Sequence, residues 1–138
     1  MTEDAKVLYT AKTHTTGGRD GVSRSCDGRL DVKLSIPGSV RIGTNPEQLF
    51  AAGWSASFEA AMEHAASEWK IILPPNLVIK TEVDLCVADG AYFLQARFNV
   101  RLPGVEREVA RALLDEAHRM CPYSKATRGN IDVVIDMV

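Results

Sequence analysis

The stretch GTNPEQLFAAGWSASFEAA, residues 43–61, predicts a long helix that organises the fold. Asn45 is a good N-cap, and Pro46 suits the first helical position. The helical pattern continues to about residue 68, and Gly53 is the position at which the helix could break. The sequence therefore predicts one long helix near the middle of the chain.

Small side chains occupy most positions of this helix, while large apolar ones lie on several of its faces. The large ones are Phe50, Trp54, Phe58 and Met62. A helix that is apolar nearly all round must be buried on most sides. Because a 138-residue chain has few elements with which to cover it, we expect a symmetric homodimer with the two helices at its centre.

Three short strands are expected before this helix. Loose alternation predicts a strand over residues 7–13, and further short strands within residues 21–26 and 30–36. Turns should lie at Gly17-Gly18 and at Asp27-Gly28.

A hairpin, a second helix and a last strand are expected after the long helix. The hairpin joins residues 77–87 to residues 91–102 through Asp89-Gly90, and residues 131–138 form the last strand. Between them, an apolar residue every fourth position predicts a helix whose stripe includes Val105, Val109, Leu113, Ala117 and Cys121. The order βββ-α-ββ-α-β predicts a single α+β domain over residues 1–138, largely antiparallel, with one or two parallel crossovers at most.

Charge and composition argue against several classes of protein. The formal net charge of -2 provides no electrostatic reason to bind nucleic acid or acidic membranes. The longest nearly apolar stretch, residues 49–62, is too short and interrupted to span a bilayer, and the initial MTEDAK does not resemble a secretory signal. An odd number of cysteines without metal-type spacing indicates a reducing, cytoplasmic setting. No motif predicts a metal site or a cofactor.

The three cysteines differ in their surroundings. Cys86 lies within a strand pattern and is expected to be an inert, half-buried side chain, whereas Cys26 adjoins a turn. Cys121 lies on the buried stripe of the second helix, and Pro122 could start a new helical turn whose N-terminal amides would favour a thiolate. From these residues alone, Cys121 is either a structural thiol or a reactive one.

TTGGR at residues 15–19, the stretch at residues 43–61 and CPYS at residues 121–124 resemble the organic hydroperoxide resistance (Ohr) branch of the OsmC/Ohr superfamily. The resemblance covers essentially the whole chain. It implies an intertwined α+β homodimer, with antiparallel-rich sheets around long central helices and an active site at each end of the subunit interface. It also implies an antioxidant thiol peroxidase that reduces organic hydroperoxides through a Cys-Cys pair, with dihydrolipoamide or a lipoylated protein as the reductant.

The same resemblance implies roles for four residues. CPYS makes Cys121 the resolving thiol, TTGGR makes Arg19 the cation that holds the peroxidatic thiolate, and NPEQ makes Glu47 the carboxylate that positions this arginine. The peroxidatic cysteine of the family falls at Ser57. Since Ser57 and Glu47 are ten residues apart, about 15 Å along an unbroken helix, Arg19 must bridge them or Glu47 must come from a partner chain.

Serine at this position should disable the family reaction. A serine hydroxyl is barely ionised at neutral pH, whereas the pKa of a thiol, ~8.5, can be brought well below 7 by a nearby cation. Oxygen also cannot form the sulfenic acid or the disulfide. Ser57 is either an engineered substitution or natural divergence, and the retained Arg19, Glu47 and Cys121 favour a deliberate or recent change. The alternative function is a non-catalytic protein that binds hydrophobic acyl ligands in the same apolar pocket.

Overall fold

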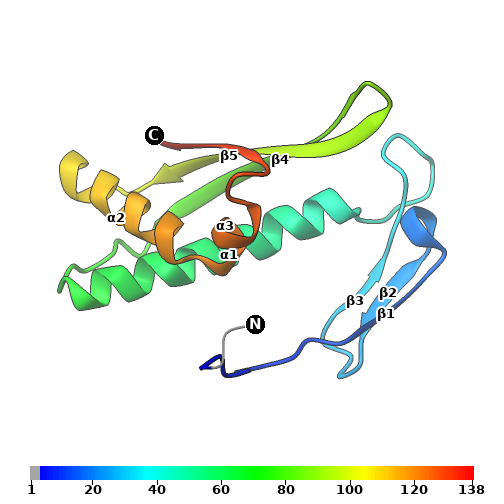
Figure 1. Ribbon diagram of the computed structural model, residues 1–138, viewed down its shortest axis with the longest axis horizontal. Coiled ribbons are helices and arrows are strands. Elements are labelled where there is room, and N and C mark those ends of the chain that lie inside the picture. The colour runs from blue at the N-terminus through cyan, green and yellow to red at the C-terminus, as the bar shows by residue number, and fades with distance from the viewer. Residues whose placement is uncertain (1–3) are drawn as a thin grey trace. The chain divides into compact units, whose positions relative to one another are not determined.

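The computed structural model describes residues 4–138, which divide into two compact units. The first unit ends at Pro46, and the second spans Glu47–Val138. Figure 1 shows the sheet of each unit and the long helix that opens the second. Residues 1–3, part of the stretch compared with a secretory signal, lie outside the described residues. The single domain over residues 1–138 stays a prediction.

The first unit is a three-stranded antiparallel sheet in the order β1-β2-β3. Its strands are β1 (Thr13–Thr16), β2 (Val22–Ser25) and β3 (Asp31–Lys33). A short 3-10 helix, η1 (Gly18–Asp20), connects β1 to β2, with φ of 78° at Gly17 and 58° at Gly18. Gly28, with φ of 77°, turns the chain between β2 and β3. Both predicted turns are confirmed, and each uses left-handed backbone that glycine adopts without strain.

The strand predicted over residues 7–13 is wrong for most of its length, because β1 begins only at Thr13. Within the described residues, those before Thr13 belong to no strand, and Val7, Leu8 and Tyr9 are all exposed. A strand must satisfy its backbone groups on a neighbouring strand. The ladder between β1 and β2 ends at the pair Thr13↔Ser25, and one further backbone hydrogen bond, from the N–H of Cys26 to the carbonyl of Lys12 at 2.9 Å, follows it.

The second unit begins with the predicted long helix. The elements are α1 (Pro46–Glu68), β4 (Val78–Ala88), β5 (Ala91–Arg101), α2 (Arg107–Met120), α3 (Pro122–Thr127) and β6 (Asp132–Met137). α1 has the predicted bounds and no break at Gly53. The second helix, the new helical turn at Pro122 and the last strand are confirmed as α2, α3 and β6.

The second sheet has the order β4-β5-β6. β4 and β5 form the predicted antiparallel hairpin, with φ of 52° at Asp89 and 78° at Gly90, as a two-residue hairpin turn of type I′ requires. β6 lies parallel to β5, so α2 and α3 form a crossover between them. The prediction of an α+β fold with mostly antiparallel pairing is confirmed.

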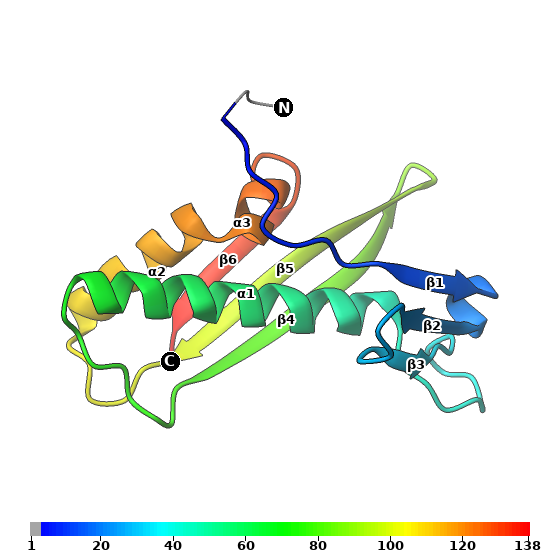
Figure 2. The same ribbon diagram turned by 90° about the horizontal axis from the view of Figure 1, so that it is seen from below.

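The core of the second unit lies between the helices and one face of this sheet. Figure 2 shows α1 and α2 in front of β4, β5 and β6. The rings of Trp54 and Phe58 on α1 each contact Phe98 on β5, with centroids 5.0 and 5.1 Å apart. α2 contributes Leu113 and Leu114, both fully buried. Burial of these side chains stabilises the unit and makes α1 the rigid element on which the candidate site is built.

The opposite face of α1 remains open in the single chain. A groove of about 440 Å³ runs along it, lined by Ala52, Ser55, Ala56, Glu59, Ala60, Glu63 and Ile79. The small side chains among these, Ala52, Ser55, Ala56 and Ala60, would let another helix approach closely. The homodimer itself stays a prediction. No helix within residues 4–138 is both long and apolar enough to cross a membrane.

Candidate functional site

Ser57 and Cys121 face one another in the second unit. Ser57 lies on α1 and is half-buried, whereas Cys121 is completely buried where α2 meets α3. Cys121 Sγ donates a hydrogen bond to Ser57 Oγ at 3.5 Å. Sequence analysis identified both positions, and the structure brings their side-chain atoms together.

The backbone of Cys121 is held from both sides. Its N–H donates to the carbonyl of Ala117 at 2.8 Å, which completes α2, and its carbonyl accepts from the N–H of Lys125 at 2.9 Å, which starts α3. Its φ of -60° and ψ of 125° are extended rather than helical, as a residue before proline prefers. Pro122 therefore separates the two helices and places the thiol at the joint.

The rest of the CPYS segment also packs on α1. The indole N–H of Trp54 donates to Ser124 Oγ at 3.2 Å, and both residues are fully buried. Tyr123 lies over Gly53: a Cβ at Gly53 would be 2.9 Å from the Tyr123 hydroxyl oxygen. The ring of Phe50 lies 6.2 Å from that of Tyr123. Gly53 thus allows close packing on a continuous helix, which explains its presence without a break.

Sequence analysis missed Ser124 and Tyr123 as site residues and treated Trp54 only as apolar mass. The sequence signal that could have linked these residues to the site is a spacing of three residues. Trp54 and Ser57 are three apart on α1, and Cys121 and Ser124 are three apart in CPYS, so each pair shares one helical face. Nothing in the sequence of α1 or of CPYS shows that these two faces contact each other.

The two charged residues of the predicted site lie farther along the chain. Glu47 is in the first turn of α1, and because the helix is continuous it lies about 15 Å along the axis from Ser57. Arg19 lies within η1 in the first unit. The predicted ion pair between Arg19 and Glu47 stays a prediction.

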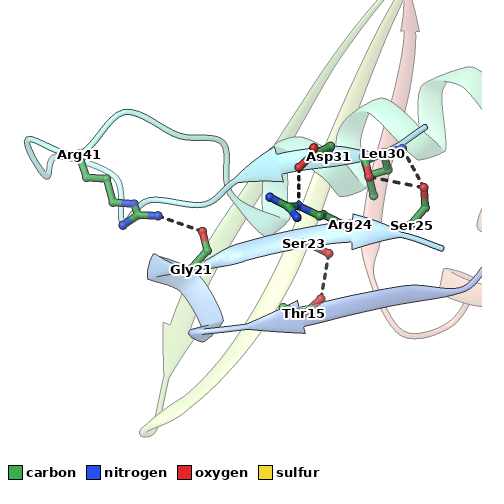
Figure 3. A network of polar contacts seen from close by, with 8 residues as sticks. All are labelled: Thr15, Gly21, Ser23, Arg24, Ser25, Leu30, Asp31 and Arg41. Atoms are coloured by element: carbon green, nitrogen blue, oxygen red, sulfur yellow. Dashed lines mark hydrogen bonds and ion pairs between the residues drawn. The ribbon is translucent and has the colours of Figure 1, made fainter. Parts of the chain in front are cut away.

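An arginine from a distant loop supports the turn that carries Arg19. Arg41 Nη2 donates to the carbonyl of Gly21 at 3.2 Å (Figure 3), and Arg41 Nε lies 3.7 Å from Asp20 Oδ1. The same Gly21 carbonyl accepts from the N–H of Leu34 at 2.9 Å. Side-chain bonds within the sheet, such as Thr15 to Ser23 at 2.9 Å, hold the adjacent strands (Figure 3).

His118 lies one turn before Cys121 on α2. Its Nδ1 is buried without a hydrogen-bond partner. Burial lowers the pKa of His118, the nearby Arg128 lowers it further, and Asp115 acts in the opposite direction. The imidazole is therefore kept neutral near pH 7, and it adds no positive charge to this end of α2.

The other two cysteines lie apart from this pair. Cys26 is exposed and Cys86 is half-buried, and all three cysteines are unpaired. Among residues 4–138, no cluster of three or more histidine, cysteine or acidic side chains could hold a metal ion.

A long helix packed on a mixed sheet, with a buried thiol facing its middle, places the chain among the α+β proteins. The model of the family described as OsmC-like protein matches residues 36–136. The chain is 43% identical over 141 residues to the organic hydroperoxide resistance protein of Xanthomonas axonopodis pv. citri, with 99% of both chains covered. The chain therefore belongs to the OsmC/Ohr family.

Solved structures agree with this assignment. The crystal structure of the organic hydroperoxide resistance protein OhrB of Bacillus subtilis is similar with a TM-score of 0.90 and 42% identity, covering 96% of this chain and 100% of that one. An organic hydroperoxide resistance protein from Legionella pneumophila is similar with a TM-score of 0.89 and 39% identity, covering 96% and 98%. The α+β fold inferred from the sequence is that of these proteins, and the intertwined homodimer stays a prediction.

Proposed function

We propose that the chain has the active-site scaffold of a thiol peroxidase that reduces organic hydroperoxides to alcohols in oxidative-stress defence. Position 57 is the peroxidatic position, and Cys121 is the resolving thiol. The observation that carries this proposal is the 3.5 Å separation of Cys121 Sγ and Ser57 Oγ. The names of the full-length relatives support the class of substrate.

The reaction requires a cysteine at position 57. Its thiolate attacks the outer peroxide oxygen, the O–O bond breaks, and the alkoxide takes a proton to leave as the alcohol. The sulfenic acid formed at position 57 is then attacked by Cys121, which releases water and closes a disulfide. The dithiol of dihydrolipoamide, free or on a lipoylated protein, returns the two electrons and becomes the cyclic disulfide.

In this proposal Arg19 and Glu47 supply the electrostatics. Organic hydroperoxides are uncharged, so the guanidinium of Arg19 stabilises the thiolate and the developing alkoxide rather than the substrate. Glu47 orients that guanidinium, from the same chain or across a homodimer. A homodimer that buries the open face of α1 would complete the site, and three unpaired cysteines suit the reducing cytoplasm.

With Ser57 the chain itself does not turn over hydroperoxide by this route. A nearby cation lowers a pKa by about 1 to 3, which does not ionise a serine hydroxyl near pH 7. The hydrogen bond from Cys121 to Ser57 is then the contact of a free thiol with an oxygen that cannot be oxidised to a sulfenic acid. The chain retains the resolving half of the pair without the peroxidatic half.

The test compares the chain with its Ser57→Cys variant, using cumene hydroperoxide as substrate and dihydrolipoamide as reductant. Alcohol formation by Ser57→Cys, and none by the parent chain, supports the proposal. Ser57→Ala is the matched control, because it removes the hydroxyl without adding a thiol. Absence of turnover in Ser57→Cys, with saturable binding of a fatty-acyl probe in all three proteins, would favour the non-catalytic acyl-binding protein instead.

A further inference from the structure

The CPYS segment contacts the middle of α1 at three points. Cys121 meets Ser57 at 3.5 Å, Ser124 meets Trp54 at 3.2 Å, and Tyr123 packs against Gly53. The Trp54–Ser124 bond lies one helical turn from the Cys121–Ser57 contact on both segments. In the Trp54–Ser124 bond, both the donor and the acceptor residue are fully buried.

We propose that Trp54 and Ser124 are positioning residues for the redox pair: their hydrogen bond orients α3 so that Cys121 Sγ points at position 57. This inference rests on the proposed function, in which positions 57 and 121 form the pair. Neither residue touches the reacting atoms in this scheme. Both act through the placement of Cys121.

Trp54 is a rigid anchor for this bond. Its indole is completely buried, with the ring of Phe50 at 5.4 Å and that of Phe98 at 5.0 Å. A side chain held between two aromatic rings on two different elements has little freedom to rotate. The indole N–H therefore points in one direction, and Ser124 Oγ must lie in that direction to accept its hydrogen bond.

α3 in turn depends on external contacts for its position. It contains only six residues, Pro122–Thr127, and so short a helix has no stability of its own in water. It is joined to α2 by the extended backbone of Cys121, whose N–H bonds to Ala117 of α2 and whose carbonyl bonds to Lys125 of α3. A buried hydrogen bond to Ser124, one turn beyond this joint, restricts rotation about it.

The restriction matters because disulfides tolerate little misalignment. Closure requires Cα atoms within about 7 Å and Cβ atoms that face one another. An anchor at Ser124 keeps Cys121 within such a geometry even when the pair is reduced. The effective concentration of one thiol at the other should therefore depend on the Trp54–Ser124 bond.

The experiment measures the equilibrium between the Ser57→Cys protein and a glutathione redox buffer, with the 57–121 disulfide quantified by mass spectrometry. Adding Ser124→Ala should lower the equilibrium constant for disulfide formation about three- to tenfold, the size of effect typical of one net hydrogen bond. For this two-electron couple the shift corresponds to about 15 to 30 mV toward easier reduction. Ser124→Thr, which keeps the hydroxyl, should keep the equilibrium constant for disulfide formation close to that of Ser57→Cys alone.

Trp54→Phe provides an independent variant, since it keeps an aromatic ring but removes the N–H donor. It should give a shift of similar size, and combining it with Ser124→Ala should add little, because both remove the same bond. Ser67→Ala is the matched control on α1, because Ser67 is exposed near the end of the helix and does not line the groove. This control should leave the constant unchanged.

An unchanged constant in both Ser124→Ala and Trp54→Phe, or an equal shift in Ser67→Ala, would overturn the inference. Because the redox titration needs no hydroperoxide, the two proposals can fail separately. A shifted constant without peroxidase activity contradicts only the proposed function, and restored activity with an unresponsive constant contradicts only the positioning role. Failure of any 57–121 disulfide to form contradicts both.

Discussion

Cys121 Sγ lies 3.5 Å from Ser57 Oγ, although the two residues are 64 positions apart in the chain. This contact predicts the outcome of a stoichiometric reaction. One equivalent of organic hydroperoxide should consume two thiols in Ser57→Cys and produce a 57–121 disulfide, and should produce none in the parent chain. Peptide mass spectrometry checks the pairing, with Cys26 and Cys86 expected to stay unpaired. A bridge from Cys121 to either of these would contradict the assignment.

Arg19 should control the acidity of the peroxidatic thiol. In the Ser57→Cys background, Arg19→Ala should raise the pKa of the introduced thiol by about 1 to 3, because a guanidinium near a thiolate stabilises the charged form. The rate of alkylation by iodoacetamide as a function of pH measures this pKa. Arg29→Ala, at an exposed position in the same unit, is the control. An identical titration with and without Arg19 would remove the arginine from the mechanism.

Arg41 should act in the same direction through the turn that carries Arg19. Its contacts with Gly21 and Asp20 are partly exposed, and exposed ion pairs contribute only about 0–1 kcal/mol. Arg41→Ala should therefore raise the pKa of the Ser57→Cys thiol by less than about 1. Hydrogen exchange should also accelerate at the Asp20 and Leu34 amides, which donate to Gly17 and Gly21. Unaltered exchange at both amides would show that Arg41 does not hold this turn.

Some elements of the fold could be predicted from the sequence and others could not, for physical reasons. α1 was predicted to both ends because Pro46 and its composition mark a helix locally. The strand over residues 7–13 was predicted wrongly, because alternation suggests strand propensity but does not show that a partner strand exists. The pairing of Cys121 with position 57 came from the family resemblance. The Trp54–Ser124 bond joins residues 70 positions apart, and no local pattern of donors and acceptors specifies it.

The open face of α1 predicts the assembly state. At micromolar concentration the chain should sediment as a homodimer, because the groove beside Ala56 offers a small-residue surface for a second helix. Ala56→Arg, which places a bulky charge in that groove, should shift the chain toward monomer. Ala112→Arg, at an exposed position on α2, should not. A monomer for the parent chain, or equal behaviour of the two variants, would contradict the predicted interface.

His118 should make the stability of the protein depend on pH below neutrality. Burial, and then Arg128, hold its pKa in the folded chain below the unfolded value of about 6.5. The unfolded chain therefore binds a proton first, so the free energy of unfolding should decrease as the pH falls below about 6.5 and through the folded pKa. Urea unfolding of the parent and of His118→Gln, between about pH 7.5 and pH 5, isolates this contribution as the difference between the two curves. His14→Gln, an exposed histidine on β1, is the control. A difference between parent and His118→Gln that stays constant over this range would show that His118 titrates alike in both states.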